Sequence, residues 1–200
     1  MRDITLCTHP NHWQKFIARR LSAGFNTIAE KIFKRDRYTC QYCEFQAKEY
    51  LDVVNHDQDY ANNKASNLVT ACPFCSQCFF LESVGLDDRS GGQLVHMPEV
   101  SQSELNAFCH ALFRAMADTS YQDDAQIAYR NLKHRAQVVE KSLGEGASDP
   151  RRMGAMLIEY KAMKNKEVSA KVLKDLRLLP IQSKFTQQLH VWNKIPMKGL

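Results

Sequence analysis

Four cysteines give this chain its clearest chemical signal, because they form two pairs with the spacing C-x-x-C. Residues 44–71 lie between the pairs and leave room for a β-hairpin and a loop. A turn with two intervening residues brings two sulfurs to one ion, and two such turns complete the tetrahedral thiolate set that structural zinc takes. The sequence therefore predicts one structural Zn²⁺ with the ligands Cys40, Cys43, Cys72 and Cys75.

The pairs have two alternative interpretations, namely four free cysteines or a C-x-x-C redox motif. A redox motif normally lies beside a βαβ pattern, and none is visible here. Segment 38–80 also carries few large apolar side chains, so a bound metal would supply much of its folding free energy. Cys78 lies three residues after Cys75 and could be a spare ligand, but a complete set of four does not need it. Cys109 is expected to be a small core residue. The surroundings of Cys7 in the sequence indicate no role for it.

The composition is that of a globular protein, with 44% hydrophobic and 24% charged residues in a chain of 200. This excludes a chain that is mainly disordered. No stretch reaches the roughly 18–20 apolar residues that a spanning helix needs, and the N-terminus lacks the pattern of a secretory signal. We expect a soluble intracellular protein, in which reduced cysteines favour metal over disulfides. The net charge of +5 permits an anionic partner without requiring one.

Periodicity predicts the elements that position the cysteines. A strand is expected at Tyr50–Asp57, just after the first pair, and the second pair is expected to open a helix within Leu68–Leu81. The other elements expected in the first hundred residues are a short strand at Asp3–Cys7, helices at Asn11–Arg20 and Phe25–Asp36, and a strand at Gln93–Met97.

After residue 100 the pattern becomes helical. Ser101 and Glu104 form a capping box, and Asp149 followed by Pro150 is typical of a helix start. The expected helices follow the capping box and cover Tyr121–Leu143, a segment beginning at Pro150, Lys166–Leu176, and a last segment marked by Ile181 to Trp192. The fold class is therefore α+β and mostly helical. We expect a cysteine-bearing unit at residues 1–100 and a helical extension at 101–200 packed on it, with one continuous domain as the alternative.

Segment 36–80 resembles the HNH endonuclease motif in its zinc-bearing form. The resemblance rests on the lead-in Lys34–Cys43, the strand end Val53–His56, and Asn67 before Cys72. It implies a ββα module whose ends are held by zinc, followed here by a bundle of helices. In that family a strand aspartate and a helix histidine hold a divalent cation, a strand histidine is the general base, and an asparagine orients it.

Only part of this catalytic set is present. His56 matches the base and Asn67 matches the central asparagine, but Asn55 stands in place of the aspartate and Ser76 in place of the helix histidine. Neutral amide and hydroxyl oxygens hold Mg²⁺ far more weakly than carboxylates. Asp57 offers a carboxylate two residues after Asn55, but on a strand it would be displaced from the position of Asn55 by about 6–7 Å. We therefore predict no catalytic residue and no enzyme. His96, His110 and His134 lie outside the motif and are treated as ordinary.

A second resemblance covers nearly the whole chain. The sequence is similar to the IcmJ (DotN) family of the bacterial Dot/Icm type IVB secretion system, in Cys72–Phe80, Glu82–Gly85, Gly144–Pro150 and Arg177–Pro180. It implies a cytoplasmic subunit, peripheral to the inner membrane, that binds the C-terminal extension of the coupling ATPase DotL and other subunits of the coupling complex.

The function predicted from both resemblances is a non-catalytic, zinc-stabilised adaptor that supports effector recruitment. The alternatives are an HNH-type endonuclease and a nucleic-acid-binding zinc module. Lys31, Lys34, Arg35 and Arg37 motivate the last, although a solvated helix face explains them better. Aromatic residues enrich interfaces, but Phe79, Phe80 and Trp192 are expected in the core.

Overall fold

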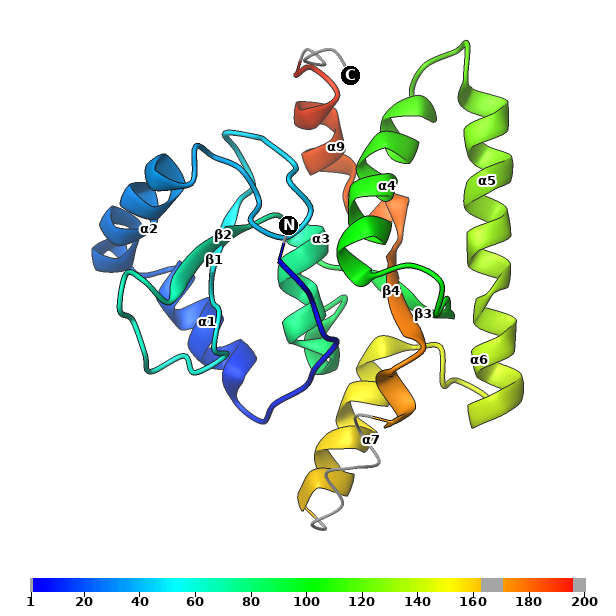
Figure 1. Ribbon diagram of the computed structural model, residues 1–200, viewed down its shortest axis with the longest axis horizontal. Helices are drawn as coiled ribbons and strands as arrows, with labels where there is room; N and C mark the ends of the chain where they lie inside the picture. The colour runs from blue at the N-terminus through cyan, green and yellow to red at the C-terminus, as the bar shows by residue number, and fades with distance from the viewer. Residues whose placement is uncertain (1, 163–170, 196–200) are drawn as a thin grey trace.

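The computed structural model describes residues 2–162 and 171–195 of the chain (Figure 1). In Figure 1 the cysteine-bearing elements lie on the left and in the centre, and the helices of residues 122–143 form the right side, with a strand from near the C-terminus between them. The architecture is α+β and mostly helical, as the sequence predicts. None of the helices within the described ranges is long and apolar enough to cross a membrane.

A β-hairpin forms the centre of the cysteine-bearing part. Strands β1 (Asp52–Asn55) and β2 (Leu68–Ala71) pair antiparallel, with Val54 opposite Val69. Every residue of both strands is buried. Helices α1 (His12–Arg20) and α2 (Ala23–Arg35) pack against the hairpin, and the short helix α3 (Pro73–Ser76) follows β2 directly. The expected hairpin and both expected helices are confirmed.

The chain leaves α3 through two 3₁₀ turns, η1 (Gln77–Phe79) and η2 (Leu81–Ser83). The strand expected at Asp3–Cys7 is not formed, so that prediction was wrong. The N-terminal segment instead bonds to separate elements, because Arg2 N donates to Gln41 O while Cys7 N donates to Cys78 O. It runs from one cysteine loop to η1 without a continuous strand partner.

A second sheet joins two distant parts of the chain. Strand β3 (Gly92–His96) pairs antiparallel with β4 (Leu176–Pro180), with Leu94 opposite Leu178. The sequence predicts a helix at Lys166–Leu176. Residues 171–173 are helical, but the predicted end is wrong because Leu176 opens β4, and residues 166–170 lie outside the described residues. The sheet pairs residues from both sides of the predicted boundary near residue 100.

Four of the remaining helices contact this sheet. Helix α4 (Gln102–Ala115) begins with the predicted capping box, in which Ser101 Oγ accepts from Glu104 N and the Glu104 carboxylate accepts from Ser101 N. The single helix expected at Tyr121–Leu143 is two, because a turn at Arg135 separates α5 (Gln122–His134) from α6 (Ala136–Leu143). The other elements are α7 (Pro150–Ala162), the 3₁₀ turn η3 (Gln182–Lys184) and α9 (Thr186–Trp192).

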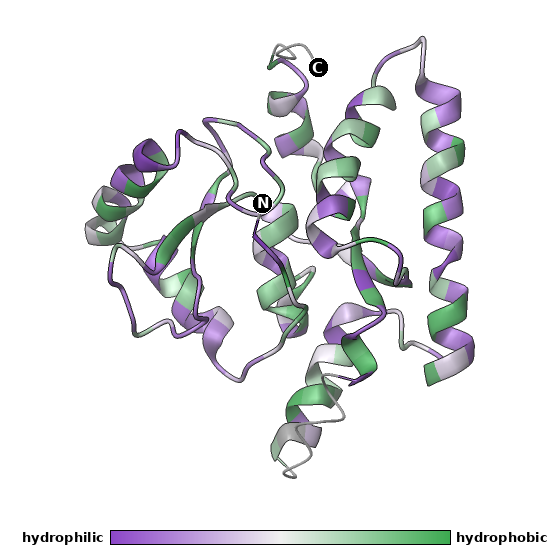
Figure 2. Cartoon of the chain, in the orientation of Figure 1, coloured by the Kyte–Doolittle hydropathy of each residue, from purple (hydrophilic) through white to green (hydrophobic). Residues whose placement is uncertain are grey.

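Most of the buried apolar side chains form one cluster that crosses both halves of the chain. Figure 2 shows hydrophobic residues in both sheets and in the helices beside them. Phe79, Phe80 and Trp192 belong to this cluster, as predicted. A smaller cluster made by α2 and the hairpin contains Phe25, Ile32, Val53 and Leu68. The cysteine-bearing and helical parts therefore share a core.

Gly154 allows α7 to approach the backbone of η2. A Cβ atom at this position would lie 2.4 Å from Glu82 N and 2.8 Å from Leu81 C. Both neighbours are backbone atoms, which cannot move aside as the end of a side chain can. The contact between α7 and η2 therefore depends on the absence of a side chain at residue 154.

We predict that Gly154→Ala lowers the free energy of unfolding by about 1–3 kcal/mol, the usual cost of overpacking. Gly24→Ala is the matched control, because Gly24 also lies in a helix but has only Ser22 Oγ near its Cβ position, at 3.8 Å. That change should be neutral or stabilising by up to about 1 kcal/mol. Urea unfolding measures both values, and equal stability of the two variants would contradict the close approach.

Candidate metal centre

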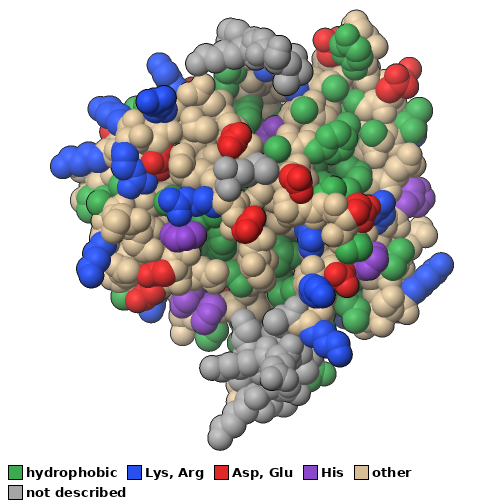
Figure 3. Space-filling model, viewed as in Figure 1, with side chains coloured by type: hydrophobic (Ala, Val, Ile, Leu, Met, Phe, Trp, Pro, Cys, Tyr) green, Lys and Arg blue, Asp and Glu red, His purple; other side chains and the backbone are tan. Residues whose placement is uncertain are grey.

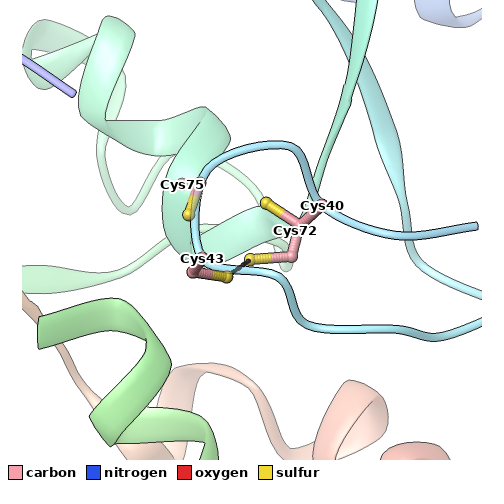
Figure 4. Close-up of side chains that lie close together, drawn as sticks. All are labelled: Cys40, Cys43, Cys72 and Cys75. Atoms are coloured by element: carbon pink, nitrogen blue, oxygen red, sulfur yellow. Dashed lines mark hydrogen bonds between the residues drawn. The ribbon is translucent and has the colours of Figure 1, made fainter. Parts of the chain in front are cut away.

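The four cysteines predicted from their spacing converge at one buried point (Figure 4). Cys40 and Cys43 come from the loop that follows α2, while Cys72 immediately precedes α3 and Cys75 lies within it. Their Sγ atoms all lie within 4.8 Å of one another, and those of Cys43 and Cys72 are 3.6 Å apart. All four residues are free cysteines rather than disulfides.

Backbone hydrogen bonds hold each pair in a turn. Cys40 N donates to Phe45 O and Glu44 N donates to Cys40 O, with Glu44 at a φ of 63°. Cys75 N donates to Cys72 O, so the turn that closes the second pair is the first turn of α3. Gln41 N donates to Thr70 O and ties the first loop to β2. The hairpin therefore positions both pairs.

The buried cluster favours a cation. Burial raises the pKa of Cys72 and Cys75 well above the ordinary value. Burial acts in the same direction on Cys40, but hydrogen bonds from the other three thiols outweigh it and bring the pKa of Cys40 well below its usual range. Without an ion, the surroundings favour a thiolate at Cys40 and thiols at Cys72 and Cys75, whereas a divalent ion at the centre would offset the charge of several thiolates. Four thiolate sulfurs suit a soft or borderline ion with tetrahedral geometry.

Two residues of α4 contact the sulfurs, and sequence reasoning missed both. Asn106 Nδ2 lies 3.2 Å from Cys75 Sγ, and His110 Nε2 lies 3.3 Å from Cys72 Sγ. Burial lowers the pKa of His110 to about 3, so its imidazole is neutral near pH 7. The residues are four positions apart and share one face of α4, but nothing in the sequence connects that face to cysteines more than 30 residues away.

The other cysteines lie outside the group of four. Cys78 Sγ donates to Phe74 O at 3.3 Å, and burial raises the pKa of this thiol. Cys109 is buried in α4 in the core. Cys7 is half-buried, with its Sγ 3.1 Å from Gln58 Oε1. Cys78 and Cys109 therefore behave as small core residues.

The two asparagines at HNH-like positions brace a loop. Asn55 is buried, and its Nδ2 donates to the carbonyl oxygens of Asp59 and Asn62, while its Oδ1 accepts from Arg19. Asn67 Nδ2 donates to Asn62 O and to Asp57 Oδ1. The structure therefore brings Asn55 and Asn67 to the same carbonyl, where both amides fix the loop between β1 and β2.

Ser76 and His56 have separate surroundings. Ser76 is buried, and its Oγ donates to Asp52 Oδ2 at 2.8 Å. His56 is exposed after the end of β1. Within residues 2–162 and 171–195, the four cysteines are the only group of three or more His, Cys, Asp or Glu side chains placed to share an ion. That group does not include His56 or Asp57.

Asp52 is a buried carboxylate that sequence reasoning did not single out. Its Oδ1 lies 3.3 Å from a guanidinium nitrogen of Arg89 and 3.7 Å from one of Arg20. Arg20 also pairs with Asp87 at 3.0 Å. The ion pairs join α1, β1 and the loop after η2, which explains how the carboxylate can be buried.

Comparison with known proteins places the chain among its relatives. No protein-family model matches it. It is 48% identical over 191 residues to the Type 4 apparatus protein DotN of Legionella pneumophila, in an alignment that covers 95% of this chain and 89% of that protein. The chain belongs to the DotN family. The expected relationship to a Dot/Icm type IV secretion component is thereby confirmed. The DotN alignment takes in nearly all of the chain rather than one module.

We predict that Cys72→Ser, which removes one of the four sulfurs, abolishes stoichiometric metal binding. The affinity should fall by more than about 100-fold, the upper range for changes around a metal site. Elemental analysis of the purified protein measures the metal content, and the melting temperature should fall with it. Cys109→Ala is the control, because it removes a buried thiol outside the cluster. Equal metal content in the two variants would exclude Cys72 as a ligand.

Proposed function

We propose that this protein is a non-catalytic adaptor subunit of the Dot/Icm type IVB coupling complex and that it binds the C-terminal extension of the coupling ATPase DotL. The observation that carries the proposal is the 48% identity to a type 4 apparatus protein across almost the whole of both chains. Through that complex we place the protein in the cytoplasm at the inner membrane, where it contacts other coupling subunits and supports effector recruitment.

We further propose that the cysteine cluster holds one structural Zn²⁺. Four sulfurs match the closed ligand set of structural zinc sites, which keep no open position for a substrate. Cys40, Cys43, Cys72 and Cys75 would hold the ion, which would supply folding free energy rather than reactivity. A structural role for the ion is consistent with a subunit that binds other proteins and does not catalyse a reaction.

The lack of catalysis is part of the proposal. Asn55 uses both amide hydrogens on backbone carbonyls, and the Ser76 hydroxyl is bonded to Asp52. Neither side chain is therefore free to replace the aspartate and histidine that hold the catalytic ion in HNH endonucleases. His56 alone provides a base without the charge that stabilises a phosphate transition state.

Two features also weigh against a dedicated nucleic-acid surface. Figure 3 shows Lys and Arg side chains over the region of α2, with acidic side chains among them. Arg35 donates to Asp36, Ala65 O and Leu68 O, and Lys34 pairs with Glu30. Two of the four basic residues that motivate a nucleic-acid surface, Lys34 and Arg35, therefore have partners within the chain.

The first prediction of this proposal is a stable complex with the partner tail. The purified protein should bind the C-terminal region of the coupling ATPase from the same organism, measured by calorimetry and by co-elution on size exclusion. A scrambled segment of equal composition is the control. Absence of binding under conditions where the protein is folded and metal-loaded would contradict the adaptor role.

The second prediction concerns cleavage, which the exposed His56 makes worth testing. Plasmid DNA incubated with the protein and Mg²⁺ or Mn²⁺ should remain supercoiled. His56→Ala is the matched variant, since it removes the one base of the motif. Nicking by the original protein that disappears in His56→Ala would overturn the non-catalytic assignment and favour an endonuclease.

A further inference from the structure

A chain of buried polar groups leads from β4 to the cysteine cluster. Leu178 N donates to Gln102 Oε1, and Gln102 Nε2 donates both to Leu178 O and to Asn106 Oδ1. Asn106 Nδ2 then lies within hydrogen-bond distance of Phe74 O and of Cys75 Sγ. Gln102 is 2% exposed and Asn106 is 0% exposed, so water does not satisfy these groups. Partly satisfied polar groups in a core are costly, and the sulfur is one of the acceptors that complete this chain.

A second contact runs through an aromatic stack. The His110 ring lies between those of Phe45 and Phe74, with centroids 3.6 Å and 4.2 Å away and interplanar angles of 3° and 17°. Trp192 of α9 meets the same imidazole edge-on at 5.2 Å and donates from Nε1 to Glu49 O. The stack directs His110 Nε2 to Cys72 Sγ and leaves the imidazole little freedom to turn away.

The chemistry of the cluster fixes the direction of both hydrogen bonds once an ion is bound. A metal-bound thiolate carries no proton, so it can only accept. An amide nitrogen can only donate, and the imidazole nitrogen must donate to a partner that has no hydrogen. Four thiolates around a divalent ion also leave a buried net negative charge, which donated N–H groups stabilise.

We propose that Asn106 and His110 are positioning residues of the metal centre: their N–H groups bind the sulfurs of Cys75 and Cys72 and thereby couple metal occupancy to the packing of α4, β4 and α9. The proposal rests on the metal site proposed above. In this arrangement the four cysteines of the first half hold the ion, and two residues of the helical half donate hydrogen bonds to their sulfurs. The ion thereby links the two halves of the chain.

The test uses the full chain and Co²⁺ as a spectroscopic probe, with Zn²⁺ affinity measured by competition against a chromophoric chelator. His110→Phe keeps a ring in the stack but removes the N–H group, and Asn106→Leu removes the other donor at similar volume. Each should lower metal affinity by about 10–100-fold. Each should also shift the sulfur-to-Co²⁺ charge-transfer band to lower energy, because the sulfur loses a hydrogen bond.

His110→Gln, which returns an N–H donor, should recover part of both effects. His134→Phe, at an exposed histidine of α5, should change neither.

Trp192 supplies an independent readout. In a Trp13→Phe background Trp192 is the sole tryptophan, since the chain has two. Removal of the metal should change its fluorescence, and His110→Phe should reduce that change at least about twofold, as expected if the imidazole relays the effect. This readout keeps the proposal testable if Asn106→Leu fails to fold.

The outcomes separate the two proposals. Affinity and band position unchanged in both Asn106→Leu and His110→Phe would overturn the positioning role while leaving the metal site intact. Failure of the original protein to bind Co²⁺ or Zn²⁺ would instead contradict the metal site itself. A normal charge-transfer band with lower thermal stability alone would show a packing role and would also overturn the inference.

Discussion

Four sulfurs buried within 4.8 Å of one another impose the main constraint on this structure. Burial disfavours a thiolate at Cys72 and at Cys75, so these two thiols are hard to ionise without a bound cation. The loops that carry the sulfurs are short and turn sharply, with positive φ at Arg37, Tyr38 and Glu44. Such backbone is retained when neighbouring structure holds it. The β1–β2 hairpin, the first turn of α3 and the contacts from α4 provide that hold, and a bound ion would add to it.

The side chains at positions 55 and 76 both serve the local structure of the cysteine-bearing part. At residue 55, two backbone carbonyls receive the amide hydrogens of Asn55. A carboxylate there would have no hydrogens to donate and would face both carbonyl oxygens, so the position is committed to bracing the loop. Asp52 Oδ2 receives the hydroxyl of Ser76 in a similar way and links β1 to α3.

Local features of the sequence predicted local features of the structure. The C-x-x-C spacing identified the cluster because each pair is closed by its own turn, and the capping box at Ser101 and the cap at Asp149 were readable for the same reason. Strand β4 was missed because its five residues lie next to a helical pattern and their partner is in β3, far away along the chain. Asn106 and His110 were missed because only the packing of α4 brings them to the sulfurs. What depended on long-range packing could not be read from spacing.

The pairing of β3 with β4 has a consequence for biosynthesis. The ribosome releases residues 92–96 long before it releases their partner, which begins at Leu176. All four clustered cysteines, in contrast, have emerged once residue 75 is outside the exit tunnel. The hairpin and its sulfurs can therefore assemble cotranslationally, whereas β3 must wait with an unpaired edge for a late segment. Such a nascent chain exposes a strand edge during elongation, and this is the stage at which a chaperone would have most to protect.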